Sequence, residues 1–197
     1  ALKNKPKSGD KVVILGGDNY RIGMGGAAVS SADTGAFGSA IELNAVQRSN
    51  PEMQKRAANA IRALVESEEN PIVSIHDHGA GGHLNCLSEL VEETGGHINI
   101  DALPVGDPTL SFKELIGNES QERMGLVINP EHTDLLKRTA DRERAPYFDV
   151  GEITSDHRFV VESNSKEIKA IDLALTDLFG NAPKMILTDR EIGRAYA

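Results

Sequence analysis

The chain has 197 residues, 39% of them hydrophobic and 26% charged, which is enough for one globular domain with a core. Its net charge of −9 and its lack of tryptophan argue against nucleic-acid binding, because an acidic surface repels phosphates and bases need aromatic platforms. No apolar run approaches the roughly 20 residues of a membrane helix, so we expect no membrane contact. The start shows no signal peptide and no initiator methionine, which indicates an internal fragment or a processed chain. The single cysteine indicates a cytoplasmic location.

The first part of the chain alternates between apolar runs and turns marked by glycine or proline. Residues 11–15 (KVVIL) predict a buried strand that ends at Gly16-Gly17, and a stretch of small residues follows at 23–40. Asn50 and Pro51 predict the start of a helix, with the asparagine as its cap. One face of that helix would carry Met53, Ala57, Ala60, Ile61, Leu64 and Val65.

The rest of the chain continues this alternation with shorter elements. We expect, in order, a strand at 72–75, a turn at 76–82, a helix over 83–91, a strand at 97–100, helical turns at 112–116, a strand at 124–128 and a helix at 130–142. Residues 148–153 and 158–162 predict an antiparallel pair of strands around Ser155-Asp156. This order predicts an α/β protein of the α+β type, with a mixed sheet and packed helices. The pattern weakens afterwards, so we expect a domain at 1–162 and a connector toward another domain at 163–197.

The first motif that could carry chemistry is the glycine-rich segment 16–28. Glycines such as Gly25 let the backbone approach a ligand closely and point N–H groups at an anion, and Arg21 adds a fork of donors for phosphate. The spacing is neither that of a Walker A loop nor that of a dinucleotide-binding turn. From these residues alone, glycines that only permit tight turns explain the segment as well.

The second motif is the sequence HDHGAGG at 76–82. Asp77 stands at the end of a strand, before a glycine turn and a helix, where a carboxylate can ligate Mg²⁺ while Gly79 and Gly81 present N–H groups to phosphate. The histidines at 76, 78 and 83 lack the spacing of a zinc site, so structural or solvent-facing roles are the simpler explanation. Cys86 is expected to fill the core.

The third motif is the polar run at 117–123 directly before a strand, which contains Glu119, Ser120 and Gln121. Such a run suits hydrogen bonding to a polar substrate. The alternative is a solvated loop with an ion pair between Arg123 and one of its glutamates. A fourth segment places Gln47 just ahead of the helix start, where it could point into a pocket or into solvent.

In this order, the motifs resemble phosphoribosylformylglycinamidine synthases of purine biosynthesis, in their long single-chain form. The matching segments are GGDNYRIGMGGAAVSS at 16–31, VQRSNPEMQKR at 46–56, IHDHGAGGHLN at 75–85, NESQERMGLVI at 118–128, RERAPY at 142–147 and NAPKM at 181–185. The resemblance implies a ligase that uses ATP to activate an amide oxygen of formylglycinamide ribonucleotide (FGAR). Ammonia from glutamine, made in a separate domain, then displaces phosphate. The chain would be the C-terminal subdomain of the first synthetase half, with the fold of the C-terminal domain of aminoimidazole ribonucleotide synthetase.

The resemblance also implies roles for individual residues. Asp77 matches a Mg²⁺ ligand, at either the catalytic or a structural nucleotide site. The substrate-binding positions matched are Gln47, Glu119, Ser120 and Gln121. No catalytic residue is assigned, and no role is given to Asp18, Asn19, Tyr20 or His78. Arg21, Gly25, Gly79 and Gly81 remain phosphate-binding candidates on physical grounds alone.

Two alternatives remain open. The chain could belong to another ATP-using member of the aminoimidazole ribonucleotide synthetase superfamily, although ESQER at 119–123 argues against this. It could also be a scaffold domain that shapes contacts without catalysis. In each case the remaining synthetase and glutaminase domains are the expected partners. The isolated chain is expected to be inactive, and self-association through an uncovered apolar face is expected.

Overall fold

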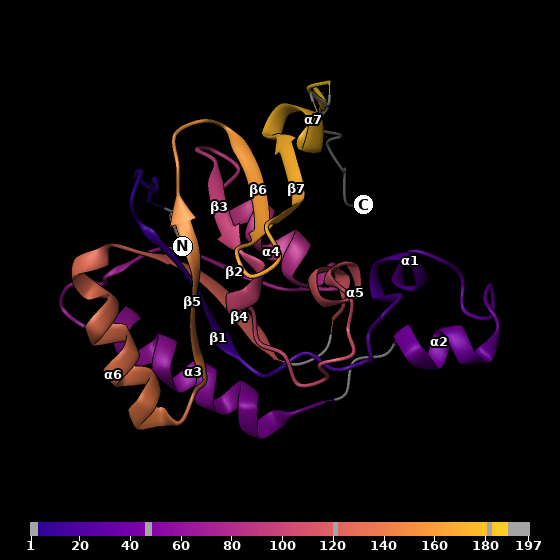
Figure 1. Ribbon diagram of the computed structural model, residues 1–197, viewed down its shortest axis with the longest axis horizontal. Helices are drawn as coiled ribbons and strands as arrows, with labels where there is room; N and C mark the ends of the chain where they lie inside the picture. Colours follow the sequence, from indigo (N-terminus) through magenta and orange to yellow (C-terminus); the bar gives the residue numbers. More distant parts are fainter. Residues whose placement is uncertain (1–3, 46–48, 120–121, 181–182, 189–197) are drawn as a thin grey trace, which may run out of the picture.

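A seven-stranded mixed sheet forms the centre of the molecule, as the sequence predicted. The computed structural model describes residues 4–45, 49–119, 122–180 and 183–188, and the structural statements below concern these residues. The strands are β1 (Lys11–Gly16), β2 (Ile72–Asp77), β3 (Gly96–Asn99), β4 (Arg123–Ile128), β5 (Tyr147–Ile153), β6 (Arg158–Ser163) and β7 (Ile168–Ala174). Their order across the sheet is β2-β4-β1-β5-β3-β6-β7 (Figure 1).

Helices cover both faces of the sheet. They are α1 (Gly26–Ser30), α2 (Ser39–Ala45), α3 (Pro51–Val65), α4 (Gly82–Leu90), α5 (Phe112–Gly117), α6 (Thr133–Glu143) and α7 (Leu175–Phe179), with the 3₁₀ turns η1 (Ile100–Ala102) and η2 (Pro130–His132). The expected start of α3 is confirmed, because the Asn50 side chain accepts a hydrogen bond from the Met53 amide at 3.0 Å and Pro51 lies in the first turn. Ala57, Ala60 and Leu64 bury the predicted face.

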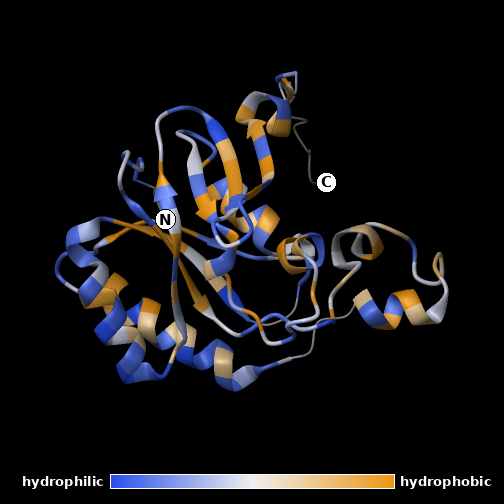
Figure 2. Cartoon of the chain, viewed as in Figure 1, coloured by the Kyte–Doolittle hydropathy of each residue, from blue (hydrophilic) through white to orange (hydrophobic). Residues whose placement is uncertain are grey.

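The core has two parts, one on each face of the sheet. On one face α3 and α6 pack against β1 and β4 through Leu64, Leu136, Val13 and Leu126. On the other face α4 and α5 pack against the same sheet through a larger cluster that includes Leu87 and Phe159. In Figure 2 the central strands carry hydrophobic stretches, whereas the outer helices mix hydrophobic and hydrophilic residues, as amphipathic helices on a sheet do.

The predicted antiparallel pairing of β5 with β6 is wrong. Both strands form, but β3 lies between them, antiparallel to β5 and parallel to β6. The turn between β5 and β6 wraps around the chain leading into β3, where the amides of Thr154 and His157 donate to the carbonyls of Gly95 and Thr94. Gly151 permits the insertion, because a Cβ there would lie 2.1 Å from the His97 carbonyl oxygen.

The segment after residue 163 begins with regular structure rather than with an irregular connector. Ile168–Ala174 forms β7, which pairs antiparallel with β6 at the edge of the sheet, and α7 follows directly. Five of the seven positions of β7 are exposed, so the strand has no buried alternating face that would mark it in the sequence, as is common for an edge strand. Where the chain leads after residue 183 stays a prediction.

The direction of three strands brings three loops to one edge of the sheet. β1 and β2 both run antiparallel to β4, which lies between them. Gly16 at the end of β1 is paired with Arg123 at the start of β4, and Asp77 at the end of β2 is paired with Met124. The segments after β1, after β2 and before β4 therefore meet at the same edge.

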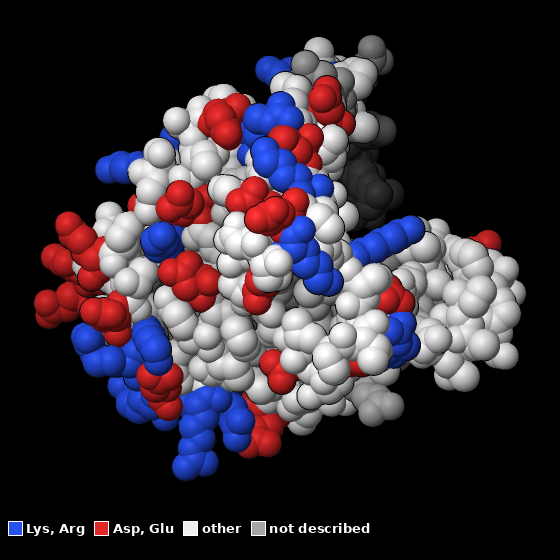
Figure 3. All heavy atoms as spheres, in the orientation of Figure 1, with Lys and Arg blue, Asp and Glu red and all other residues white. Residues whose placement is uncertain are grey.

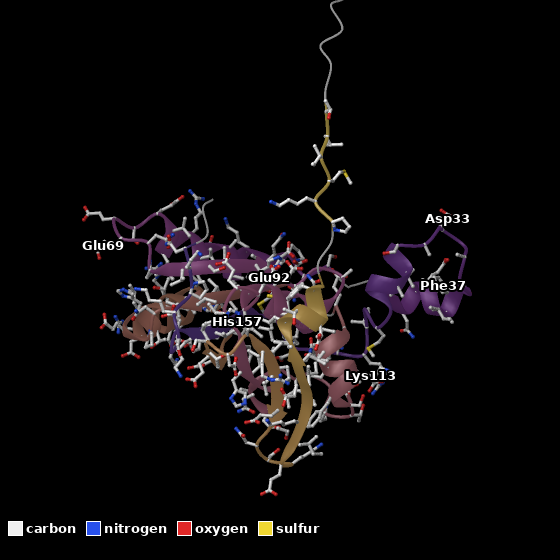
Figure 4. The ribbon with its side chains drawn as sticks, turned by 90° about the horizontal axis from the view of Figure 1, so that it is seen from above. Asp33, Phe37, Glu69, Glu92, Lys113 and His157 are labelled. Carbon is white, nitrogen blue, oxygen red and sulfur yellow. The ribbon has the colours of Figure 1, made fainter. Side chains whose placement is uncertain are left out.

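The segment that carries α1 and α2 projects from the body of the molecule (Figures 1 and 4). Asp33 and Phe37 lie at its far end in Figure 4, and Figure 3 shows few charged side chains on this lobe. Phe37, Ile41 and Leu43 are exposed there. No helix among the described residues is both long and apolar enough to cross a lipid bilayer.

Candidate functional site

Three segments, at residues 16–26, at 77–82, and at 118–119 with 122–123, pack against one another at this edge of the sheet, and we call them the three-loop site. A Cβ on Gly26 would lie 3.1 Å from the Ala80 carbonyl oxygen and 3.2 Å from Oε2 of Glu119, so all three loops meet at Gly26. A Cβ on Gly82 would lie 2.2 Å from the Asn118 carbonyl oxygen. Backbone contacts this close require glycine, and they fix the loops relative to one another.

Asp77 ends β2 at the three-loop site, with its side chain 72% exposed. The next turn contains Gly79, whose φ of +51° suits glycine, and Gly81 caps the start of α4. In the first turn of α4 the Gly82 amide donates to the Gly79 carbonyl at 3.3 Å, while the next amides have no acceptor within the helix, in a segment that follows the exposed Asp77 carboxylate. Among the described residues no group of three or more His, Cys, Asp or Glu side chains could hold a metal ion. A site built on Asp77 would therefore rely on ligand oxygens and water, as Mg²⁺ sites commonly do.

Glu119 is the described member of the predicted substrate-binding triplet, and it is half-buried. Burial raises the pKa of its carboxyl, the charge of Arg123 opposes this, and the charges of Glu122 and Asp77 raise it further. The two carboxylates therefore influence each other across the three-loop site. A partly desolvated carboxylate accepts hydrogen bonds more strongly than one in bulk water, which suits the recognition of hydroxyl or amide donors.

Arg21 points to a different place from the one the phosphate prediction requires. Its guanidinium forms an ion pair with Glu114, donates to the carbonyl and hydroxyl oxygens of Thr109 at 3.1 Å each, and lies 3.8 Å from Asp107. These partners belong to α5 and the loop before it. Gly25 is the N-cap residue of the five-residue helix α1. The phosphate-binding roles of Arg21 and Gly25 stay predictions.

A buried polar network lies behind the three-loop site, and the sequence did not reveal it. Arg123 donates to the Asn118 carbonyl from Nη2 at 3.1 Å, and its Nη1 lies 3.2 Å from Nε2 of His83. Nδ1 of His83 lies 2.9 Å from Nε2 of His78. Burial, and then the charge of Arg123, hold the pKa of both histidines well below the ordinary value. The expected ion pair between Arg123 and a neighbouring glutamate does not form in the described part of the chain.

Two buried residues of the motifs, Asn19 and Cys86, have structural roles. Asn19, which received no role, is fully buried and donates from Nδ2 to the Leu115 carbonyl at 2.8 Å. Its backbone also accepts from the amides of Gly106 and Asp107, so it anchors the loop that Arg21 holds. Cys86 fills the core as predicted, and burial raises the pKa of its thiol to about 12. A thiol with that pKa is not a nucleophile at neutral pH.

Gln47, Ser120 and Gln121 lie outside the described residues. The roles predicted for these three residues stay predictions.

The chain is a domain of mixed α and β structure, with glycine turns and carboxylates at one edge of its sheet. The chain belongs to the family described as AIR synthase related protein, C-terminal domain, whose model matches residues 7–164. It is 46% identical over 158 residues to the phosphoribosylformylglycinamidine synthase of Dictyostelium discoideum. The aligned region covers 78% of this chain and 12% of that protein. The chain spans 12% to 15% of the length of the curated relatives it matches.

Solved structures agree with this assignment. The Thermotoga maritima PurL complexed with FGAR superposes with a TM-score of 0.81 at 26% identity, over 98% of this chain and 31% of that chain. The same T. maritima protein complexed with ATP superposes with a TM-score of 0.73 at 24% identity, over 98% of this chain and 29% of that chain, which bears on the fold alone.

Proposed function

We propose that this chain is one domain of a longer phosphoribosylformylglycinamidine synthase and that its three-loop site contributes to binding FGAR. The observation that carries the proposal is the convergence of Glu119 with the Asp77 turn, in a chain 46% identical to a relative of that name. The likeness to a PurL complexed with FGAR supports the same substrate. The activity would be ATP-dependent carbon–nitrogen ligation with glutamine as the source of ammonia, in the cytoplasm.

In this proposal the substrate loop recognises the polar part of FGAR. Glu119 accepts hydrogen bonds from ribose hydroxyls or from amide N–H groups, and Ser120 and Gln121 both donate and accept. Gln47 adds a contact from the segment before α3. The close packing of Gly23 against Glu119 and of Gly82 against Asn118 fixes the backbone at these two residues, which would help to position a substrate.

The proposed nucleotide contacts lie in the Asp77 turn of the three-loop site. Asp77 would hold Mg²⁺ together with oxygens of the bound phosphates and water, and its exposure leaves it free to do so. Mg²⁺ neutralises charge on the transferring phosphoryl group when it is bound. The N–H groups of the turn at 79–82 would meet phosphate oxygens at the start of α4. In the reaction, the amide oxygen of FGAR takes the γ-phosphoryl group of ATP, and ammonia then displaces phosphate from that carbon.

The remaining synthetase and glutaminase domains are the proposed partners of this domain. The isolated chain would have no turnover, because groups that hold ATP and release ammonia would come from those domains. The structure changes the basis for the expected self-association. The central strands are covered on both faces, and the exposed large apolar side chains include three on the α1–α2 lobe as well as Met185, Ile186 and Leu187.

Steady-state kinetics on the full-length polypeptide test the substrate assignment. With ATP and ammonia saturating, Gln121→Ala should raise KM for FGAR by roughly ten- to a hundredfold, the loss of one buried hydrogen bond to substrate. Gln54→Ala, an exposed glutamine on α3, is the matched control and should change nothing. Unchanged KM in Gln121→Ala would mean that the loop only decorates the surface, and the substrate assignment would be lost.

A further inference from the structure

The buried network behind the three-loop site joins its two functional loops. Arg123 binds the carbonyl of Asn118, the residue directly before Glu119. Through His83 the same guanidinium reaches His78, the residue directly after Asp77. The network therefore connects the loop that carries Glu119 to the turn that carries Asp77.

Hydrogen-bond chemistry fixes the protons along this network. An arginine side chain only donates, so Nε2 of His83 must accept from Nη1 of Arg123. Neutral His83 then carries its proton on Nδ1 and donates it to Nε2 of His78. His78 in turn carries its proton on Nδ1, an atom that forms no hydrogen bond of normal geometry within the described residues. The obligatory donation by Arg123 therefore determines which ring nitrogen of His83 and of His78 carries the proton.

Arg123 is an unusual choice for a purely structural position. It is 4% exposed, and its Nε atom has no hydrogen-bond partner in the described part of the chain. A buried charge is unfavourable for folding, and the charges of Glu119 and Asp18 only partly offset the effect of burial on Arg123. Burial lowers the pKa of Arg123 only to about 10, so the guanidinium stays charged at neutral pH. An arginine at this position contacts two segments at once, since it binds the Asn118 carbonyl and His83. We take this double contact as the reason for an arginine here.

We propose that Arg123 is a positioning residue that, with His83 as its relay, sets the distance and orientation between the Glu119 loop and the Asp77 turn. The inference rests on the proposed function, because those two loops would bind FGAR and the phosphates. A lysine at 123 keeps the charge but donates from one nitrogen, so it lacks the planar fork whose two nitrogens reach His83 and Asn118. A glutamine at 83 can accept from Arg123 and still donate to His78, whereas a leucine can do neither.

The first test reads the proton positions directly in the 197-residue chain. Nitrogen-detected NMR of the imidazole rings at neutral pH should show His83 and His78 both neutral and both protonated on Nδ1, the less common tautomer. Signals that disappear in His83→Gln assign His83. Protonation of His83 on Nε2 would overturn the proposal, because Arg123 could not then donate to it.

The second test compares paired variants in the full-length enzyme. Arg123→Lys and His83→Leu should each lower kcat/KM for FGAR by roughly a hundredfold, the effect of a misplaced binding group, while His83→Gln keeps most of the activity. Arg138→Lys, an exposed arginine on α6, is the control. Melting temperatures are measured on all four proteins.

The pattern of the results separates positioning from plain stability. If Arg123 serves only folding, Arg123→Lys and His83→Leu will lower the melting temperature while the folded enzyme keeps its kinetic constants, and that outcome overturns the proposal. If Arg123→Lys does not fold, the comparison of His83→Leu with His83→Gln carries the test. If the unmodified enzyme does not use FGAR, the proposed function fails, and the NMR result still decides whether the relay exists.

Discussion

Gly23 and Glu119 lie backbone against backbone. The amide of Glu119 donates to the Gly23 carbonyl at 3.2 Å, and a Cβ on Gly23 would lie 1.7 Å from the Glu119 carbonyl oxygen. Gly23 also has a φ of +70°, which side chains rarely adopt. Gly23 in the glycine-rich segment therefore fixes the backbone at Glu119.

Gly23→Ala should disturb both stability and substrate binding. The methyl group forces the Glu119 backbone to move, and the positive φ adds strain, so we expect a loss of about 1–3 kcal/mol in the free energy of unfolding. In the full-length enzyme KM for FGAR should rise as the loop shifts. Urea denaturation of the chain and steady-state kinetics of the enzyme measure the two effects.

Gly38→Ala is the matched control for Gly23→Ala. Gly38 is exposed, its φ is not positive, and a Cβ there would meet no atom within 4 Å beyond its chain neighbours. The substitution should change neither the urea midpoint nor KM. Equal effects of the two substitutions would show that the Gly23 contact has no special role.

Glu119→Gln should weaken substrate binding without weakening the fold. The amide keeps the shape of the side chain but removes the charge that accepts from hydroxyl and N–H donors. A hydrogen bond to a charged acceptor contributes about 1.5–3 kcal/mol, so KM for FGAR should rise by roughly ten- to a hundredfold. The exposed Glu68→Gln is the control. An unchanged KM in Glu119→Gln would remove Glu119 from the site.

Local patterns allowed the sequence to predict most elements but not their long-range contacts. The cap at Asn50 and the apolar run of β1 depend on neighbouring residues, and both are confirmed. The insertion of β3 between β5 and β6 depends on contacts between residues far apart along the chain, such as His97 with Glu152. No local signal marks it, although Gly151 in the middle of a strand is a hint of close backbone approach.

In the site, too, local patterns were predictable from the sequence and long-range contacts were not. The local pattern put Asp77 at the end of β2, and it put Glu119 shortly before β4, which neighbours β2 in the sheet. It missed Arg123 and His83, because a buried arginine and a buried histidine look in sequence like any charged or polar residues. Their pairing depends on β4 and α4 packing together, which only the fold reveals.

His83 should make stability depend on pH. Its pKa in the folded chain lies well below the ordinary value of 6.5, because of burial and then the Arg123 and His78 contacts. Below pH 6.5 the unfolded chain binds a proton there that the folded chain does not, so the free energy of unfolding falls as the pH falls. The slope is about 1.4 kcal/mol per pH unit until the folded-state pKa is reached.

Urea denaturation at about pH 7.5 and about pH 5.5, on either side of the ordinary histidine pKa, measures this dependence. The difference between the two pH values should be smaller in His83→Gln than in the unmodified chain. His132→Gln, before α6, is the control and should leave the difference unchanged. Identical pH dependence with and without His83 would mean that the imidazole is protonated in the fold.

Asp77→Asn should separate metal dependence from folding. The side chain is 72% exposed, so its substitution should leave the melting temperature within the small range typical of surface changes. In the full-length enzyme the Mg²⁺ concentration needed for half-maximal activity should rise, and kcat should fall. Asp33→Asn, at the tip of the α1–α2 lobe, is the control. An unaltered Mg²⁺ requirement would show that Asp77 is not a metal ligand.

The most direct test of the central claim is the substrate dependence of ADP release by the full-length enzyme. With ATP, Mg²⁺ and ammonia present, the account predicts ADP release that requires FGAR, falls at least about tenfold in Glu119→Gln, and is unaffected in Glu68→Gln. The same assay on the isolated chain should give no turnover. ADP release that ignores FGAR, or that persists unchanged in Glu119→Gln, would contradict the assignment of this domain to FGAR binding.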